Sequence, residues 1–595
     1  METTQAKLEL LRDWMKRESI DAYCVPRADE YLGEYLPEFN ERLHWLSGFT
    51  GSAGMAVVLA DEAAIFVDGR YTVQVRRQVD ENLFAIEHLI ENPPTTWLAG
   101  QLKSGSRVVI DPRMCSLSWY ESSEKTLAKA GILLAGDAQN PIDRFWNNRP
   151  SVASTAATLL DVAYSGETAA SKRARMGRRV QEAGADAALL FAPESVSWLL
   201  NIRGDDVPCV PVVLAAAMLE GNGSVHLLID RARVPDLLDE HTGGGVFVID
   251  EREAAEFLCA WGGKTVLADP NSGNAWTQMM LREGGATLLA GDDPVMLEKA
   301  CKNPVEIEGA RAAHRRDALA VIRFLAWIDR SIDDGKALSE DDLAQKLTSL
   351  RAELELFQGP SFDTISAAGA NAAMCHYNHL DNPVSYLERD SVYLVDSGGQ
   401  YLDGTTDITR TVTTGAVSLE LKRKFTLVLK GHIALDQARF PPGTTGTHLD
   451  ALARQFLWAE GCDFDHGTGH GVGAYLSVHE GPQRIAKAWN SAPLALGMVV
   501  SNEPGYYRDG AFGIRCENLL LVRECDDAQF EKPMLEFEAI TLVPFDRRLI
   551  DVMLLTPEER NWVDQYHRRV LKELPLELLC PEDRAWLETA AAPLP

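Results

Sequence analysis

The sequence predicts a chain of the α/β plus α+β class, with two α/β domains followed by an α+β domain built on an antiparallel sheet. Three observations support this prediction. Amphipathic helices alternate with short apolar strands up to about residue 300. The same order of elements occurs twice in that part of the chain. Beyond Gln358, short β-like runs alternate with glycine-rich turns.

The duplication divides the N-terminal half. The first copy is predicted to hold a helix over 8–18 and strands over 21–26, 55–60 and 63–70; the second is predicted to hold a helix over 176–184 and strands over 186–193, 210–216 and 224–231. The loop GFTGSAG at 48–54 lacks the Lys-Ser/Thr ending and the GxGxxG spacing of phosphate-binding loops, so a tight turn is expected. The polar stretch NNRPS at 147–151 separates a domain over 1–150 from a second over 151–303.

The third domain is predicted over 304–550. Asn303 before Pro304, with acidic residues in the first turn, is typical of a helix start. Ser339 with Asp342 starts a second helix. Further helices are expected over 419–438 and 448–461, and strands over 361–369, 391–401, 407–415, 497–505, 512–522 and 537–545. A C-terminal extension over 551–595 has its own helix cap at Thr556 and is expected to pack on the domain before it.

Composition excludes several classes of protein. The net charge of -29 argues against nucleic-acid or anionic-membrane partners, which need clustered Lys and Arg. The first residues lack the apolar core of a signal peptide, and the longest apolar runs are too short to span a bilayer. The ten cysteines are scattered without a CxxC pair, which favours reduced thiols in a cytoplasmic protein over a disulfide framework.

Five candidate metal ligands stand out in the third domain. Four are carboxylates that end or interrupt apolar strands, and the fifth is a histidine between glycines: Asp396, Asp407, Glu503, Glu517 and His470. Each carboxylate taken singly is expected to be a strand-end cap or an ion-pair partner. Together they form a hard, oxygen-rich set that is unsuited to structural zinc and suits a pair of divalent ions such as Mn²⁺. Such a pair can polarise a carbonyl and deprotonate a shared water.

The motifs that contain these residues resemble those of the pita-bread metallopeptidases, and among them the long, three-domain cytosolic aminopeptidases P. The resemblance rests on NPVEIEGARAAHRRD, DSGGQYLDGTTDITRT, HGTGHGVG, VHEGP, SNEPGYY and GIRCEN. It implies two creatinase-like N-terminal domains and a pita-bread catalytic domain with a curved antiparallel sheet. It also implies a cytoplasmic homodimer that hydrolyses the bond between an N-terminal residue and a following proline.

The resemblance also implies a role for each site residue. Asp396 would hold one metal, Asp407 and Glu517 would bridge both, and His470 and Glu503 would hold the other, with Glu503 also accepting the proton of the bridging water. His376, His466 and His479 would act on the substrate side, and Arg515 would lie at the substrate site and orient a ligand carboxylate. The alternative for each histidine is a ring satisfied by backbone, and for Arg515 a strand-surface residue. His379, His432 and His448 have no expected role.

Other functions stay open at this point. A prolidase, which cuts only Xaa-Pro dipeptides, uses the same ligands, although the long chain favours the aminopeptidase. A non-catalytic pita-bread peptide-binding protein would be expected to lack ligands, and none is lost here. A creatinase-type hydrolase works without metals, and a methionine aminopeptidase lacks the two N-terminal domains.

Overall fold

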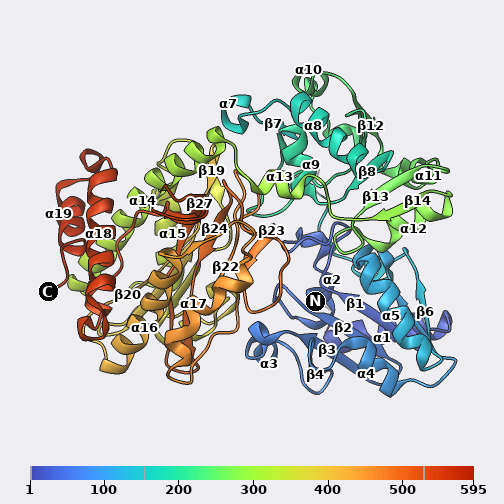
Figure 1. Cartoon of the computed structure of the whole chain (residues 1–595). Coiled ribbons are helices and arrows are strands. Elements are labelled where there is room, and N and C mark those ends of the chain that lie inside the picture. Colours follow the sequence, from blue (N-terminus) through green and yellow to red (C-terminus); the bar gives the residue numbers. More distant parts are fainter. Residues whose placement is uncertain (1–2, 153–154, 527–528) are drawn as a thin grey trace. The chain divides into compact units, whose positions relative to one another are not determined.

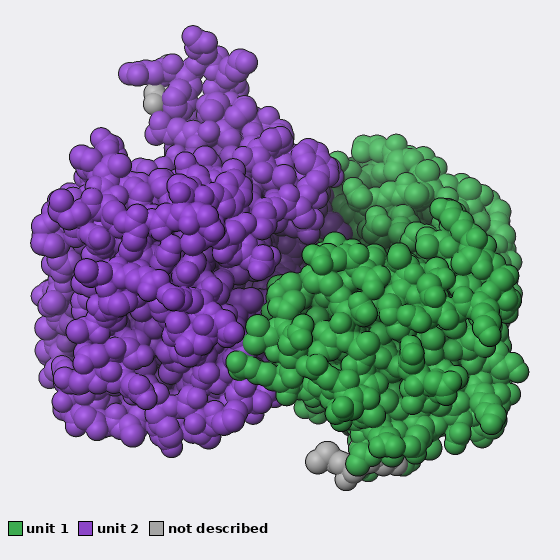
Figure 2. Space-filling view, turned by 90° about the horizontal axis from the view of Figure 1, so that it is seen from below, with its two compact units in different colours: residues 1–160, 167–295 green, residues 161–166, 296–595 purple. Residues whose placement is uncertain are grey.

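The computed structural model describes residues 3–152, 155–526 and 529–595. It divides into two compact units, coloured in Figure 2. Unit 1 comprises residues 1–160 and 167–295, and unit 2 comprises residues 161–166 and 296–595. Most residues of the two predicted N-terminal domains lie in unit 1, but residues 161–166 and 296–303 of the second predicted domain belong to unit 2. Among the described residues, no helix is long and apolar enough to cross a membrane.

Unit 1 contains two six-stranded sheets with helices around them (Figure 1). The first has the order β4 (Ala85–His88), β3 (Ala63–Val67), β2 (Met55–Leu59), β1 (Ala22–Pro26), β5 (Arg107–Ile110) and β6 (Leu133–Gly136). The second has the order β12 (Val246–Ile249), β11 (Val225–Leu228), β10 (Ala216–Glu220), β8 (Ala187–Leu190), β13 (Thr265–Ala268) and β14 (Thr287–Ala290). The longer helices are α1 (Thr4–Arg17), α4 (Pro94–Gln101), α5 (Leu117–Lys129), α8 (Ala169–Glu182), α9 (Pro193–Leu200) and α12 (Ala275–Glu283).

The two sheets of unit 1 have the same topology, which confirms the predicted duplication. In the first sheet β1 pairs antiparallel with β2 and parallel with β5, and the outer pairs β3–β4 and β5–β6 are parallel. In the second sheet β8 takes the place of β1, with β10 antiparallel and β13 parallel to it, and the outer pairs β11–β12 and β13–β14 are again parallel.

The strand predicted over 210–216 is wrong in position. The ladder strand β10 begins only at Ala216, and the preceding residues run extended without pairing in the sheet. Pro211 has no N–H to give to a ladder. The amides of Val213 and Leu214 donate to side chains instead, to Ser197 Oγ and Asp206 Oδ2.

The GFTGSAG loop is a turn, as predicted. Gly48 ends α2 (Arg42–Ser47) in the left-handed region, with φ 84°. A Cβ on Gly51 would lie 2.2 Å from the ring of Phe49. These glycines serve local chain geometry and leave no reason to assign a phosphate site.

Unit 2 is built on antiparallel sheets. Three-stranded sheets are formed by β16 (Ile365–Ala368), β17 (Val392–Ser397) and β20 (Ile408–Thr413), and by β15 (Phe357–Pro360), β18 (Gly399–Tyr401) and β19 (Gly404–Thr405). A six-stranded sheet has the order β21 (Arg439–Phe440), β28 (Leu535–Ala539), β27 (Asn518–Glu524), β24 (Val499–Asn502), β22 (Gly469–Gly471) and β23 (Glu480–Ile485). A hairpin joins β25 (Gly505–Arg508) to β26 (Phe512–Arg515). The predicted antiparallel α+β domain is thereby confirmed.

Three helices of unit 2 begin at the predicted caps. Beside the short α7 (Val162–Ser165), the described helices of unit 2 are α13 (Met296–Ala300), α14 (Pro304–Asp333), α15 (Glu340–Arg351), α16 (Leu419–Asp436), α17 (Gly446–Trp458), α18 (Pro557–Glu573) and α19 (Pro581–Ala590). Asn303, Ser339 and Thr556 each form a capping box. α16 and α17 pack side by side, with α16 against β24 and α17 against β23 (Figure 1).

Three predicted strands of unit 2 need correction. The run over 391–401 is two strands, β17 and β18, which belong to different sheets. The run over 512–522 is two strands, because Cys516 and Glu517 leave the ladder and donate their amides to Pro504 O and Thr409 O. The run over 537–545 stops pairing at Ala539. Beyond it the guanidinium of Arg410 donates to the carbonyl of Val543, so this part satisfies its backbone through a side chain.

The C-terminal extension packs on the rest of unit 2, as predicted. Val563, Tyr566 and Val570 of α18 and Leu587 of α19 are buried in the same apolar core as α14 and α16. Trp562 of α18 donates a hydrogen bond from Nε1 to Asp436 Oδ2 on α16 at 2.7 Å.

The start of α14 is joined to a distant piece of chain. The short helix α7 (Val162–Ser165) belongs to unit 2, although its sequence neighbours lie in unit 1. Asn303, the N-cap of α14, donates from Nδ2 to Ser165 O at 2.8 Å. A Cβ on Gly166 would lie 2.4 Å from Asn303 Oδ1, so this close approach requires glycine.

Candidate metal centre

The predicted carboxylates lie at strand ends that meet in unit 2. Asp396 is in β17, Asp407 directly precedes β20, Glu503 directly follows β24, and Glu517 lies in the break between β26 and β27. β17 pairs with β20, β24 pairs with β27, and Glu517 donates its amide to Thr409 of β20. Four separate strand ends thus bring four carboxylates into one place.

His470 of β22 lies among these carboxylates. Its Nε2 is 3.5 Å from Asp407 Oδ2 and 3.4 Å from Glu503 Oε1. Its Nδ1 is 2.9 Å from the carbonyl oxygen of Gly471, which accepts only, so Nδ1 carries the hydrogen and Nε2 is directed at the carboxylates. Asp407, His470 and Glu517 each place a ligand atom within 4.8 Å of the other two.

The donor set fits divalent cations. Asp396 Oδ1 and Asp407 Oδ1 are buried and accept no hydrogen bond, which is costly for a carboxylate oxygen. Burial, with the negative charges of Asp407 and Glu503, raises the pKa of Asp396 to about 6 although Arg515 opposes the shift. Burial and the same neighbours also raise the pKa of Glu517. The cluster therefore has more negative charge than its protein neighbours neutralise.

Arg515 holds one edge of the cluster, as expected of a residue that orients a ligand carboxylate. It is 2 % exposed, and its Nη2 donates to Asp396 Oδ2 at 2.5 Å. Its Nε donates to Thr409 Oγ1 at 3.1 Å, and that hydroxyl donates to Glu517 Oε2 at 2.7 Å. Its Nη1 donates to Tyr507 Oη at 2.6 Å. The planar guanidinium thus fixes two of the carboxylates relative to each other.

The glycines beside His470 allow the neighbouring strands to approach closely. A Cβ on Gly469 would lie 2.0 Å from the carbonyl oxygen of Ser501, and one on Gly471 would lie 2.5 Å from that of Glu480. The neighbouring strands β24 and β23 therefore exclude a side chain at these two positions.

His376 and His479 flank the cluster. The ring of His479 packs against that of His470, with centroids 4.2 Å apart and planes at 70°. His376 follows Cys375, whose carbonyl accepts from Arg515 Nη1 at 3.3 Å. Both histidines are partly exposed, as is Glu503, in contrast to the buried Asp396, Asp407 and Glu517. This placement suits the substrate-side roles predicted for them.

His466 lies in a different situation. Its Nδ1 is 2.7 Å from the carbonyl oxygen of Gly467, so this nitrogen carries the hydrogen, and Nε2 accepts from Tyr507 Oη at 2.7 Å. Burial and the positive charge of Arg515 lower its pKa, which keeps the ring neutral. Both nitrogens are thus used inside the protein. This geometry favours the alternative of a satisfied histidine, and the catalytic role of His466 stays a prediction.

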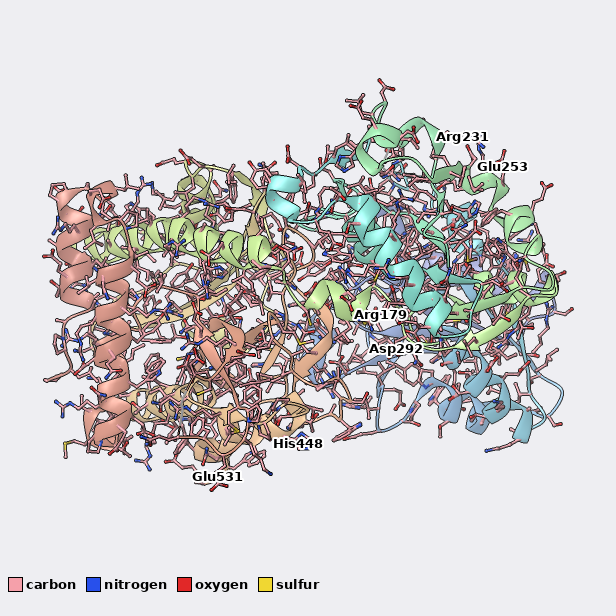
Figure 3. All side chains as sticks on the ribbon, turned by 45° about the horizontal axis from the view of Figure 1, so that its top comes forward. Arg179, Arg231, Glu253, Asp292, His448 and Glu531 are labelled. Atoms are coloured by element: carbon pink, nitrogen blue, oxygen red, sulfur yellow. The ribbon has the colours of Figure 1, made fainter. Side chains whose placement is uncertain are left out.

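The remaining histidines lie outside the cluster. His448 is at the outer edge of unit 2 (Figure 3) and its Nδ1 accepts from the amide of Thr445. His379 Nε2 is 3.6 Å from Asp341 Oδ1. His432, predicted to have no special role, is buried in α16, and its Nδ1 lies 3.0 Å from the carbonyl oxygen of Asn502 and 3.2 Å from that of Cys516. These are the residues immediately before Glu503 and Glu517, so His432 supports the backbone of both.

Several supporting residues were missed because no motif marks them. Glu340 of α15 accepts from Tyr377 Oη at 2.7 Å and from the amide of Ala368 at 2.7 Å, and so anchors the segment that carries His376. Ser501 donates to Glu503 Oε1 at 3.1 Å and accepts from the His470 amide at 3.0 Å. Only the alternation of side chains along VVSNE could have suggested that Ser501 faces the site.

Comparison with known proteins gives a consistent assignment. Residues 308–524 match the model of metallopeptidase family M24, residues 7–145 and 148–306 match models of the creatinase/prolidase N-terminal domain, and residues 533–594 match the C-terminal region of peptidase M24. A probable Xaa-Pro aminopeptidase P of Laccaria bicolor is 39% identical over 99% of this chain and 94% of its own length. One from Paracoccidioides brasiliensis is 38% identical over all of both chains.

A solved structure extends the similarity to the whole fold. The X-prolyl aminopeptidase from Caenorhabditis elegans, described as a cytosolic enzyme with a dinuclear active site, matches all of both chains with a TM-score of 0.95 at 34% identity. Full-length similarity at this level, together with the matched domain models, leaves no part of the fold unassigned. The chain belongs to metallopeptidase family M24, among the Xaa-Pro aminopeptidases P that carry two creatinase-type N-terminal domains.

Proposed function

We propose that this protein is a metal-dependent aminopeptidase that hydrolyses the bond between an N-terminal residue and a following proline. One observation carries the proposal. Asp407, His470 and Glu517 place ligand atoms within 4.8 Å of one another, Glu503 and Asp396 lie beside them, and one oxygen each of Asp396 and Asp407 is buried without a hydrogen bond. The names of its full-length relatives support the same activity.

Five residues would hold two divalent ions. Asp396 would bind one ion and His470 the other; Asp407 and Glu517 would bridge both, and Glu503 would complete the set. Bound ions of this kind polarise a carbonyl and lower the pKa of a water to near neutrality. Oxygen-rich ligands favour Mn²⁺ over a structural zinc, so manganese is the proposed metal.

The protein's own groups would orient the peptide and move the proton. Glu503 would accept a proton at a carboxylate oxygen and pass it to the prolyl nitrogen, which must be protonated to leave. His376 and His479 would donate hydrogen bonds to the substrate oxygen on which negative charge develops. Arg515 would keep Asp396 in its ionised form and in place, at the edge of the substrate site. A dedicated enzyme is needed because proline lacks an N–H and has a fixed φ.

The location and partners of the protein are part of the same proposal. We place the protein in the cytoplasm as a homodimer that acts on peptides with proline at the second position, without nucleic-acid or membrane partners. The strongly negative net charge of -29 supports the absence of phosphate-binding surfaces. For the domains, the proposed division is 1–150, 151–303, 304–550 and a helical extension over 551–595.

Hydrolysis of Arg-Pro-Pro beside Ala-Pro tests the function. Metal-stripped protein is assayed with and without Mn²⁺. Release of arginine only with Mn²⁺, and little cleavage of the dipeptide, is the expected result. Preference for Ala-Pro would assign a prolidase. Failure to cleave either peptide with two ions bound would indicate a peptide-binding protein without catalysis.

A further inference from the structure

Two lysines and one glutamate form a buried ion cluster in unit 2, outside the set of proposed ligands. Lys299 of α13 donates to Glu480 Oε2 at 2.5 Å, and Lys302 donates to Glu480 Oε1. The three side chains are 5%, 2% and 1% exposed. Lys302 also donates to the carbonyl of Ala300 at 3.3 Å. The Lys299–Glu480–Lys302 cluster therefore joins α13 and the residues after it to the first residue of β23.

The cluster is next to the catalytic groups along the chain. Glu480 directly follows His479, whose ring packs on the proposed ligand His470. His479 lies in the bend directly before β23, so the position of its ring depends on where the side chain of Glu480 anchors the backbone. If the side chain of Glu480 shifted, the backbone beside it would shift as well and would move the imidazole of His479.

Backbone pairing alone does not fix this segment. In the β22–β23 ladder, His470 is paired with Arg484 but the next residue, Gly471, is paired with Glu480, so the register shifts at this point. Irregular pairing of this kind loosens and bends a strand and often aims a side chain at a site. The hydrogen bonds of Glu480 to the two lysines therefore supply a constraint that the ladder lacks.

A purely stabilising role explains the cluster less well. Buried ion pairs lose much of their Coulomb energy to desolvation, and apolar residues of similar size often stabilise a fold equally. What the ions provide in addition is direction, because each lysine binds a different oxygen of one carboxylate. We infer that Lys299 and Lys302 are positioning residues of the active site, which act through Glu480 to fix the orientation of His479. This inference rests on the proposed function.

The test compares three variants of the Mn²⁺-loaded enzyme: Glu480→Gln, His479→Ala, and the two combined. Kinetics with Arg-Pro-Pro, metal content and thermal unfolding are measured for each. The Glu480→Gln change is expected to lower kcat about tenfold or more at full metal content, in the range seen for residues that orient active-site groups. In the His479→Ala background the same change should have little further effect, because both act through one imidazole. If the losses in kcat from Glu480→Gln and His479→Ala multiply in the double variant, the inference is overturned.

A second variant separates positioning from stability. Replacing Lys299, Lys302 and Glu480 together by methionine leaves no charge unpaired and should fold with a melting temperature near that of the wild type. Its kcat should nevertheless stay as low as that of Glu480→Gln. Wild-type kcat in this variant would show that the cluster only stabilises. Lys487→Met is the matched control, since Lys487 pairs with Asp463 at 2.9 Å in an exposed position just after β23.

Equilibrium binding of the product dipeptide Pro-Pro to the metal-loaded protein gives a readout that needs no turnover. Glu480→Gln and His479→Ala should weaken binding by similar factors, and Lys487→Met should not. A wild type that cleaves no peptide would reject the proposed function, and the binding measurement would then decide the positioning role. Unchanged binding in Glu480→Gln would overturn it.

Discussion

Arg515 and Asp396 are joined by a buried hydrogen bond of 2.5 Å between Nη2 and Oδ2. Among the described residues, neither has another oppositely charged partner as close, and Arg515 also bonds to Thr409 and Tyr507 through its remaining nitrogens. A single planar group thus connects a proposed metal ligand to the hydroxyl that holds Glu517. The orientation of the ligands depends on the shape of this group as well as on its charge.

Arg515→Lys is therefore expected to lower metal affinity and kcat by about 10- to 100-fold, because an ammonium keeps the charge but cannot donate in three fixed directions. Calorimetric Mn²⁺ titration and Arg-Pro-Pro kinetics measure both. Arg508→Lys is the control, since Arg508 of the neighbouring strand is half-exposed and pairs with Glu420. An Arg515→Lys enzyme with wild-type metal affinity and kcat would contradict the role.

Gly469→Ala should disrupt the centre while Gly467→Ala should not. A Cβ at Gly469 would lie 2.0 Å from Ser501 O and would push β22, with His470, away from β24. A Cβ at Gly467 would meet its nearest atom, Ile485 O, at an ordinary 3.5 Å. The expected loss of stability for Gly469→Ala is about 1–3 kcal/mol, with weaker metal binding. Urea unfolding and metal titration of the two variants decide the matter, and equal behaviour would refute the packing argument.

Metal removal should lower the thermal stability of unit 2. Without cations, four carboxylates lie close together, and ions that bind only the folded state stabilise it by about 2.7 kcal/mol at 100 times Kd. Calorimetry of stripped protein with increasing Mn²⁺ should show a rising melting temperature. Asp407→Asn should melt higher than the wild type when both are stripped, because repulsion is reduced, and should respond less to Mn²⁺. A stripped Asp407→Asn protein that melts below the stripped wild type would contradict the proposed repulsion among the four carboxylates.

Asp29 in unit 1 should give the protein a pH-dependent stability. Burial raises the pKa of this carboxyl to about 7, although the amides of Gly33 and Tyr31 donate to it. The folded protein holds the proton of Asp29 more tightly than the unfolded chain does. The resulting contribution to the free energy of unfolding is therefore complete below about pH 4 and is lost as pH rises through about 7. The full change is on the order of 4 kcal/mol.

Asp29→Asn should remove this dependence of the free energy of unfolding on pH, whatever the substitution does to stability at a single pH. Urea unfolding at several pH values between roughly 4.5 and 8, which span the transition, measures the slope. Asp13→Asn is the control, since Asp13 is an exposed residue of α1. An unchanged slope in Asp29→Asn would show that another group titrates.

Much of the fold could be predicted because local signals and packing agree. The caps at Asn303, Ser339 and Thr556 mark helix starts that the structure has, since each side chain satisfies otherwise unpaired amides. The strand predicted over 210–216 was wrong in position because the side chains of Asp206 and Ser197 accept hydrogen bonds from two of its amides. Apolar patterning contains no information about such tertiary hydrogen bonds.

Only part of the candidate site could be predicted from the sequence. Carboxylates that end apolar strands are unusual, so Asp396, Asp407, Glu503 and Glu517 could be selected from the sequence. The residues that hold the site in place could not. The buried lysines beside Glu480 lie 181 and 178 positions before it, and only the folded chain brings them together.

The junction between Asn303 and Ser165 has a consequence for how the protein is made. Its two halves are 138 positions apart, and at about 5–20 residues per second the ribosome needs roughly 7 to 28 s to add the second after the first. During that time residues 161–166 wait for their partner in unit 2, while most of unit 1 is already synthesised and can fold. For the same reason, a gene fragment beginning at Met296 does not encode all of unit 2, and such a fragment would leave the N-cap of α14 without its partner.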